Sequence, residues 1–318
     1  MRILALTGPT ASGKTALSLG LAERLGLEVV CLDSMQIYKD MNIGTAKPTA
    51  QERERVPHHM VDFVPFWENY STENYKADVI PVINDIYSRG KAPIFVGGTG
   101  LYVDTLMGRG ENLAPPSDRE YIEEKHSMIK TGEDVHALWL RLAEVDTESA
   151  AAIHENNVKR VLRALEIYEK SGKTKTYFDN ESKKKAPLFD IGMITLDIHS
   201  RDLLYRRADD RVDEMLKAGL LTEVQELRDK GLFVGDTTAS QAIGYKELGE
   251  YLSGKVTLSE AVENLKMATR RYAKRQLTWF RHVKDAYRLF IDTEDGKLRS
   301  YDDLLDEALA VCEKIIQN

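Results

Sequence analysis

The sequence predicts an α/β fold in which a parallel sheet is flanked by helices, together with a smaller all-helical insertion. Over the first hundred residues, short apolar runs alternate with helical patterns, which is typical of parallel strands joined by covering helices. The first apolar run leads into G-x-x-x-x-G-K-[ST] at residues 8–15, a phosphate-binding loop that joins a strand to a helix. From about residue 117 to residue 180, the pattern is helical without a clear strand.

The alternation within residues 1–112 predicts the first part of the core. Its apolar runs fit strands that are buried on both faces of a sheet. We expect strands at residues 3–7, 28–33 and 93–97. We expect helices at residues 16–25 and 72–89, with a polar loop from the second strand to about residue 70.

A break in composition at Pro115 and Pro116 begins the insertion, which we predict at residues 113–186. Its helices are expected at residues 119–130, 134–144, 147–153 and 158–171. The lysine run 183–185 precedes Pro187 and predicts a mobile linker. The second part of the core, residues 187–318, should contain a strand at 191–196, a helix from about 204 to 216, further C-terminal helices and a short strand at 287–291.

The loop at residues 8–15 predicts phosphate or diphosphate binding in a P-loop NTPase-like core. Its glycines let the backbone wrap an anion, so that N–H groups and a helix N-terminus point at phosphate oxygens. Lys14 adds a mobile charge, and the Thr15 hydroxyl is suited to ligate a Mg²⁺ carried by the phosphates. The residues assigned to diphosphate or nucleotide binding are Gly8, Thr10, Ala11, Ser12, Gly13, Lys14 and Thr15.

Asp33 is the one carboxylate at the end of a predicted strand near this loop, because the strand at 93–97 runs into Gly97-Gly98-Thr99-Gly100. Nucleotide-hydrolysing enzymes with such loops use an Asp at this position to hold the metal, and the residue type alone favours a metal ligand or a helix N-cap. The alternative is a general base at the carboxyl end of a parallel sheet. The Gly-Gly-Thr run is either a second backbone cradle or an ordinary strand-to-helix turn.

The composition fits a globular protein of a reducing compartment. Of 318 residues, 42% are hydrophobic and 8% aromatic, which is ordinary for a globular chain. The two cysteines, Cys31 and Cys312, lie far apart, so we expect no disulfide framework. Neither a signal peptide nor a membrane span is apparent. We therefore expect a cytoplasmic protein with no membrane partner, and a monomer by default.

Two basic clusters contrast with a net charge of −7. Residues 270–288 contain seven Arg and Lys residues and one acid, Asp285, and residues 159–185 contain nine Arg and Lys residues. One such stretch is commonly a solvated helix face, but two of them on an acidic protein favour polyanion binding.

The first of these clusters has a helical periodicity. Arg271, Lys274 and Arg275 share one face of the expected helix. Tyr272 and Trp279 turn towards another face, where we expect core packing rather than base stacking.

Several segments follow one another in a distinctive order from Leu4 to about Arg281. After the phosphate-binding loop come Asp33-Ser34-Met35-Gln36-Ile37-Tyr38, Gly44-Thr45-Ala46-Lys47-Pro48, Pro57-His58-His59, Val96-Gly97-Gly98-Thr99-Gly100-Leu101-Tyr102, Arg160-Val161-Leu162-Arg163-Ala164-Leu165-Glu166, Gln241-Ala242-Ile243-Gly244-Tyr245-Lys246-Glu247 and the run 269–281. This ordered set resembles the tRNA dimethylallyltransferases, also called tRNA isopentenyltransferases. The family often has a Pro and an Asp after His154, whereas this chain has Glu155 and Asn157.

The resemblance implies transfer of a dimethylallyl group from dimethylallyl diphosphate to N6 of adenine 37, in tRNAs that read codons beginning with U, giving N6-isopentenyladenosine. It implies that Asp33 is the base, that Thr99 orients the adenine or Asp33, and that Arg207 adds positive charge at the diphosphate. Mg²⁺ would be the cofactor and the tRNA anticodon stem-loop the partner. The residues assigned to tRNA binding are Asp33, Ser34, Met35, Gln36, Thr99, Lys159, Arg160, Arg163, Arg271, Lys274 and Arg275.

Other interpretations stay open at this point. Arg211 shares a helix face with Arg207, yet it could equally pair with Asp210 or Asp213. A nucleotide kinase would use the same loop for ATP, with the helical insertion as a lid, although the basic clusters argue against it. A non-catalytic RNA-binding protein would have little use for a complete loop together with Asp33.

Overall fold

The computed structural model describes residues 2–108, 113–184, 186–235 and 237–317. The chain divides into two compact units. Unit 1 comprises Met1–Val103 and Phe189–Asn318, and unit 2 comprises Asp104–Leu188. The insertion that the sequence predicts, residues 113–186, falls within the span of unit 2.

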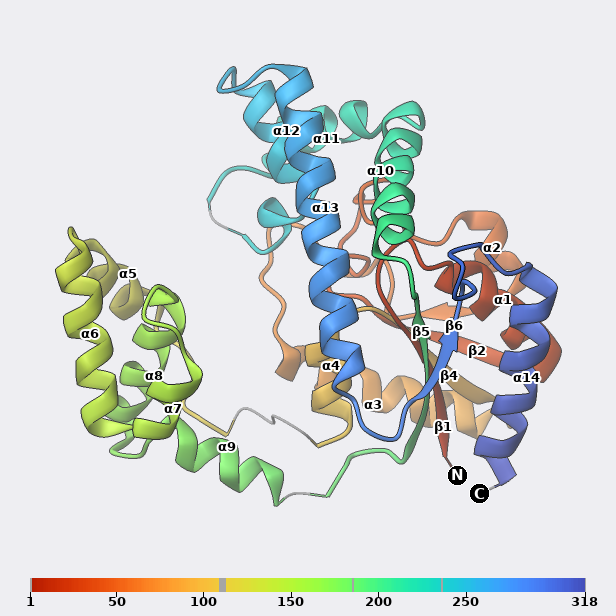
Figure 1. Ribbon diagram of the computed structural model, residues 1–318, viewed down its shortest axis with the longest axis horizontal. Coiled ribbons are helices and arrows are strands. Elements are labelled where there is room, and N and C mark those ends of the chain that lie inside the picture. The colour runs from red at the N-terminus through yellow and green to blue at the C-terminus, as the bar shows by residue number, and fades with distance from the viewer. Residues whose placement is uncertain (1, 109–112, 185, 236, 318) are drawn as a thin grey trace. The chain divides into compact units, whose positions relative to one another are not determined.

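In the described part of unit 1, six parallel strands form one sheet in the order β3-β2-β4-β1-β5-β6 (Figure 1). The strands are β1 (Ile3–Thr7), β2 (Leu27–Leu32), β3 (His58–His59), β4 (Ala92–Gly97), β5 (Ile191–Asp197) and β6 (Tyr287–Phe290). Every residue of β1 and β2 is buried, as expected for strands covered on both faces. The parallel sheet is thereby confirmed.

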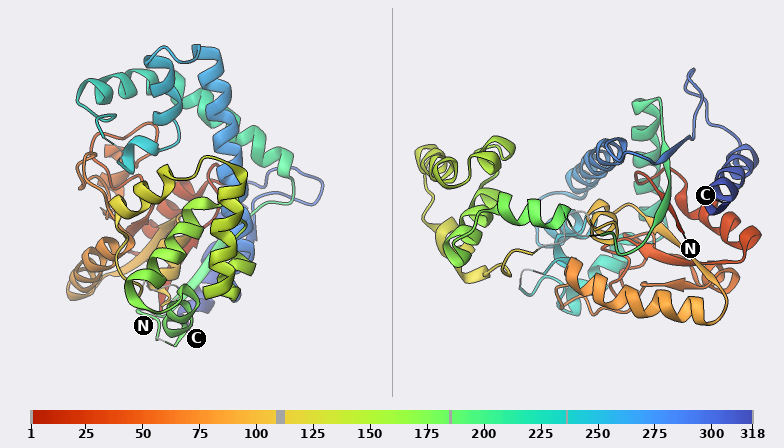
Figure 2. Two further views of the ribbon diagram at one scale, coloured as in Figure 1. Left: turned by 90° about the vertical axis from the view of Figure 1, so that its left-hand side faces the viewer. Right: turned by 90° about the horizontal axis from the view of Figure 1, so that it is seen from below.

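Helices cover both faces of this sheet (Figures 1 and 2). On one face, α1 (Lys14–Leu25) and α14 (Tyr301–Gln317) share a core with alternate strand residues such as Ile94. On the other face, Tyr75 of α3 (Thr72–Ser88) stacks on Tyr102 of α4 (Gly100–Leu106), with ring centroids 3.9 Å apart.

The polar loop expected before residue 70 is partly structured, and in that respect the prediction is wrong. It contains α2 (Ala50–Arg55) as well as β3. Thr49 and Glu52 form a capping box that starts α2. Both elements are too short to give a periodic signal in the sequence.

A second core lies beyond the carboxyl ends of the strands. It involves α10 (Arg201–Lys217), α11 (Leu220–Asp229), the 3₁₀ turn η1 (Ala239–Gln241), α12 (Tyr245–Leu252) and α13 (Leu258–Arg281). In Figure 1, these helices stand above the sheet, where β1 and β5 end. Ile37, Tyr38 and Phe66, from the chain after β2, pack against them. Packing therefore fixes the segment that follows Asp33.

Among its described residues, unit 2 contains helices and no strand, with Leu142, Val161 and Leu165 in its core. Its helices are α5 (Arg119–Ser127), α6 (Gly132–Val145), α7 (Thr147–Ala152), α8 (Val158–Ser171) and α9 (Lys175–Lys183). The prediction of a mobile linker at 183–185 is wrong for Lys183, because this residue ends α9. Lys185 lies outside the described residues.

Two expectations about the whole chain can be checked. Cys31 and Cys312 are free and buried, as the sequence predicts. None of the helices formed by the described residues has the length and apolar character needed to cross a membrane.

Candidate active site

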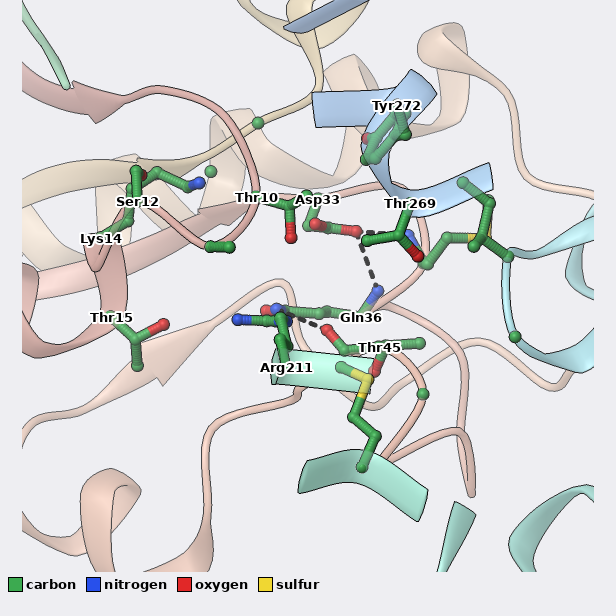
Figure 3. Close-up of a pocket in the computed structure, with 18 of the residues that line it drawn as sticks. Thr10, Ser12, Lys14, Thr15, Asp33, Gln36, Thr45, Arg211, Thr269 and Tyr272 are labelled. Carbon is green, nitrogen blue, oxygen red and sulfur yellow. Dashed lines mark hydrogen bonds between the residues drawn. The ribbon is translucent and has the colours of Figure 1, made fainter. Parts of the chain in front are cut away.

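A cavity of about 710 Å³ opens in unit 1 where β1, β2 and β4 end (Figure 3). The phosphate-binding loop, the segment after β2, and helices α10 and α13 form its walls. Most of the site residues predicted in unit 1 line it: Thr10, Ala11, Ser12, Gly13, Lys14, Thr15, Asp33, Ser34, Met35, Gln36, Arg207 and Arg275. Segments far apart in the sequence thus meet at the sheet edge where such sites lie.

The phosphate-binding loop is compact and leads directly into α1. Gly13 occupies the N-cap of α1 with φ 95°, a left-handed conformation that glycine adopts without strain. The Lys14 ammonium folds back onto the loop and donates to the carbonyls of Gly8 (3.0 Å) and Pro9 (2.6 Å). The buried Ser12 hydroxyl has no hydrogen-bond partner among the described residues. The loop therefore contains a hydroxyl without a partner and an ammonium group, both of which are suited to bind an anion.

Two arginines of α10 bring positive charge to this loop. Arg207 donates from Nε to the carbonyl of Ala11 at 2.7 Å, which fixes the guanidinium beside the loop. Arg211 lines the cavity and has no ion pair among the described residues. Asp213, one of its two expected partners, pairs with Lys266 at 2.7 Å. Arg211 therefore belongs to the site, and its pairing with Asp213 is excluded.

Lys14 has an unusual acidity for a lysine. Burial, reinforced by the charge of Arg211, lowers its pKa to about 7, against the opposing effect of the Asp33 carboxylate. A bound anion would reverse much of this shift, because it favours the charged ammonium.

Asp33 lies half-buried between the loop and α13 (Figure 3). Its Oδ1 accepts from the backbone N–H of Met35 (2.8 Å) and of Gln36 (3.4 Å). These bonds close a turn and not a helix, so Asp33 is not a helix N-cap. No hydrogen bond from another described residue reaches Oδ2. One oxygen fixes the carboxylate, and the other is available to a ligand.

Hydrogen bonds hold the segment after Asp33 to Thr99, which follows β4, and to the loop at residues 45–46. Thr99 accepts from the N–H of Ser34 at 3.1 Å and donates its own N–H to Leu32 at 3.1 Å. The Gln36 amide is engaged internally: Nε2 donates to the carbonyls of Thr45 and Ala46, at 3.1 and 3.2 Å. Thr99 and the Gln36 side chain therefore support the site, although Thr99 is not among the residues that line the cavity.

Gln276 of α13 is a site residue that the sequence analysis missed. Its amide accepts from the N–H of Thr10 at 2.8 Å and donates to the carbonyl of Gly98 at 2.9 Å. A Cβ on Gly98 would lie 2.2 Å from Nε2 of Gln276, and one on Gly97 would lie 2.2 Å from the carbonyl of Leu32. The two glycines are needed for close packing, which favours the ordinary turn over a second cradle.

Tyr272 was expected in the core, but it lines the cavity (Figure 3). Burial, reinforced by the nearby Asp33 carboxylate, raises the pKa of its hydroxyl, so that the group stays protonated. The guanidinium of Arg275 lies 5.7 Å from the centroid of its ring. Helical spacing alone did not distinguish a core face from a cavity face.

The cations of α13 fall into two groups. Arg270 pairs with Asp209 and Arg281 with Asp197, each at 2.6 Å. Arg271 and Lys274 are exposed, and among the described residues neither has an ion pair.

The predicted tRNA-binding residues of unit 2 also differ from one another. Lys159 and Arg160 are exposed on α8. Arg163 instead pairs with the fully buried Glu166 at 2.5 Å and donates to the carbonyl of Pro115. These assignments to tRNA binding stay predictions, and the contacts of Arg163 give it a structural role in unit 2.

Comparison with known proteins identifies relatives of this chain. A model of the IPP transferase family matches residues 36–283. Proteins named tRNA dimethylallyltransferase from Bacillus velezensis and Bacillus subtilis are each 48% identical, over 88% of this chain and 88% of their own length. These names favour a transferase over the nucleotide kinase that the loop alone would allow.

Solved structures agree. A crystal structure of the full-length tRNA isopentenylpyrophosphate transferase from Bacillus halodurans has a TM-score of 0.72 and 39% identity, over 99% of this chain and 97% of that one. A eukaryotic dimethylallyltransferase acting on tRNA has a TM-score of 0.79 and 32% identity, over all of this chain and 80% of that one. The arrangement of the sheet and its helices is thus that of a known fold, and the chain belongs to the IPP transferase family.

Proposed function

We propose that this protein transfers a dimethylallyl group from dimethylallyl diphosphate to N6 of adenine 37, in tRNAs that read codons beginning with U. The observation that carries the proposal is that a phosphate-binding loop and a half-buried carboxylate, Asp33, open into the same cavity. The names of the relatives give the same donor group and the same acceptor class.

The loop side of the cavity suits the diphosphate of the donor. Lys14 and Arg211 line it, and Arg207 is held beside it through the carbonyl of Ala11. Charge on the diphosphate grows as its bond to the dimethylallyl carbon breaks, so fixed cations there stabilise the transition state more than the ground state. The loop would therefore serve a transferase, with the diphosphate as leaving group.

Asp33 suits the acceptor side. The lone pair of an adenine N6 is delocalised into the ring, which makes N6 a poor nucleophile. A carboxylate oxygen that accepts from N6–H raises the electron density on nitrogen and takes the proton as the new C–N bond forms. Oδ2 of Asp33 is available for this, because Oδ1 is held by Met35 and Gln36.

Magnesium fits the residues around Thr15. Thr15 lines the cavity, and Ser12 of the same loop lines it with a hydroxyl that has no hydrogen-bond partner among the described residues. Among the described residues, no group of three His, Cys, Asp or Glu side chains could hold a metal ion. Phosphate oxygens and water would thus supply most ligands, as Mg²⁺ prefers. When bound, the ion would neutralise charge on the diphosphate.

The anticodon stem-loop is the proposed partner. The target base must leave its stack, at a cost of a few kcal/mol that other tRNA contacts offset. Exposed cations on two helices support this: Arg271, Lys274 and Arg275 on α13, and Lys159 and Arg160 on α8. We also propose that the protein acts in the cytoplasm, since its two cysteines are free, and we take a monomer as the default.

The experiment is to incubate the purified protein with Mg²⁺, radiolabelled dimethylallyl diphosphate and unmodified tRNA carrying A36-A37, and to analyse the nucleosides. We expect the label in N6-isopentenyladenosine, none in a tRNA with guanosine at position 37, and a rate of labelling at least about 10²-fold lower with Asp33→Asn. Absence of label in tRNA, together with ATP-dependent phosphorylation of a nucleotide, would overturn the proposal.

A further inference from the structure

One carboxylate outside the cavity wall gathers four hydrogen-bond donors. Glu223, on α11, accepts from the backbone N–H of Asn42 (3.0 Å) and Ile43 (2.8 Å) on one oxygen. Its other oxygen accepts from the N–H of Gly44 (3.1 Å) and from the Tyr245 hydroxyl (2.6 Å). Three successive backbone N–H groups that converge on one anion make a strong, directional anchor.

The packing around this anchor is close. A Cβ on Gly44 would lie 2.5 Å from the ring of Tyr245, so the ring and the backbone are in direct contact. Burial raises the pKa of the Tyr245 hydroxyl, and the adjacent Glu223 raises it further, so the hydroxyl remains a donor. A second contact joins the same segments: Lys230, the residue that follows α11, pairs with Asp40 at 3.2 Å. Helix α11 and its C-terminal cap therefore hold this loop at two points.

The anchored loop leads directly to the active site. The carbonyls of Thr45 and Ala46, next in sequence, take both N–H groups of the Gln36 amide. The oxygen of that amide accepts from the Cys31 thiol at 3.3 Å. The Gln36 side chain therefore has one orientation, and its backbone N–H contacts Oδ1 of Asp33.

We propose that Glu223 is a positioning residue for the reaction. Its carboxylate fixes the backbone of residues 42–44, and the carbonyls of Thr45 and Ala46 then orient Gln36. The backbone N–H of Gln36, together with the closer N–H of Met35, holds Oδ1 of Asp33. This inference rests on the proposed function for its effect on turnover, but the chain of contacts can be tested without it.

The first test is Glu223→Gln, which keeps the shape and removes one of the two accepting oxygens. Because a small misplacement of a catalytic group costs up to about 10²-fold in rate, we expect kcat with tRNA to fall about tenfold. The KM for dimethylallyl diphosphate should stay within about twofold, because the phosphate-binding loop is not part of this chain of contacts. Glu226→Gln, an exposed change on the same helix, is the matched control and should leave kcat unaltered.

A double-mutant cycle with Gln36→Ala separates positioning from general damage. If Glu223 acts through Gln36, Glu223→Gln should cost nothing further in a Gln36→Ala background. Additive losses would overturn the proposal, and so would an unchanged kcat in Glu223→Gln. Should Glu223→Gln fail to fold, Tyr245→Phe removes a single donor and enters the same cycle, where additivity again overturns the proposal.

Amide hydrogen exchange provides a readout that does not depend on activity. In Glu223→Gln, or in Tyr245→Phe if the former does not fold, we expect faster exchange both at residues 42–47 and at residues 34–37. Faster exchange confined to 42–47 would mean that Glu223 is a local anchor only, and would overturn the proposal. If the wild-type protein transfers no label to tRNA, the proposed function fails, and this exchange pattern still decides whether Glu223 controls the segment after Asp33.

Discussion

In unit 1, Lys14, Arg207 and Arg211 surround a cavity whose wall also holds a carboxylate, Asp33. Among the described residues of unit 2, by contrast, several cations pair with carboxylates of their own unit. Arg163 pairs with Glu166, Lys170 with Asp118 and Lys175 with Asp179. In the cavity, Lys14 and Arg207 instead donate to loop carbonyls.

This difference decides what a cluster of Lys and Arg in a sequence means. The nine cations of residues 159–185 look like a large basic patch, but several of them are neutralised within unit 2. Of the three residues of unit 2 that the sequence assigns to tRNA binding, Lys159 and Arg160 remain candidates, because among the described residues neither has an ion pair, whereas Arg163 does. Ion pairing, rather than the number of cations, decides how much charge is free to attract a polyanion.

The largest expected effect tests the carboxylate of the cavity. Asp33→Asn keeps an oxygen that accepts from Met35 and Gln36, but it removes the base. We expect kcat to fall by roughly 10²–10⁴-fold, while tRNA binding, measured by filter retention, changes little. An unaltered kcat would limit Asp33 to its structural role in the turn that follows β2, and loss of activity only at low Mg²⁺ would make it a metal ligand.

The next effect tests whether Arg163 is structural. Substitution of Arg163 removes the cation that lies closest to the fully buried Glu166 carboxylate. Breaking a fully buried pair costs about 3–5 kcal/mol, and since Arg163 is partly exposed we expect Arg163→Ala to lower the free energy of unfolding by about 2 kcal/mol. Urea unfolding of Arg163→Ala and of Arg160→Ala provides the comparison, and the second variant should unfold like the wild type. Equal stability of the two would contradict the structural role.

The third effect follows from the acidity of Lys14. With a pKa lowered to about 7, Lys14 in the free enzyme loses its charge as the pH rises through 7. Because the charged form binds the diphosphate, we expect the KM for dimethylallyl diphosphate to rise above pH 7, by up to about tenfold per pH unit. An arginine keeps its charge over this pH range. If the Lys14→Arg enzyme still binds the donor, its KM should therefore depend less on pH than that of the wild type. A pH dependence that is the same in both enzymes would assign the titration to another group.

The sequence could predict those parts of the site that are close together in the chain. Every strand except β3, the phosphate-binding loop and Asp33 are marked by short local patterns, and the structure contains each of them. Gln276 could not be found in this way, because its two partners, Thr10 and Gly98, lie in distant segments that only the fold brings together. Tyr272 was assigned to the core for a related reason. Helical periodicity shows which residues share a face of the helix, but not whether that face packs in the core or lines a cavity.

The smallest expected effect compares exposed cations of the two units directly. Each phosphate contact that is lost should reduce the slope of log binding constant against log salt by about 1, with only a modest loss of affinity. We expect this for Arg271→Ala on α13 and for Arg160→Ala on α8, measured by tRNA binding between low and physiological salt. Lys175→Ala, in which a cation already paired with Asp179 is removed, is the control and should leave the slope unchanged. A reduced slope for Arg271→Ala alone would restrict tRNA binding to α13, whereas an equal reduction for Lys175→Ala would mean that pairing within unit 2 does not neutralise its cations.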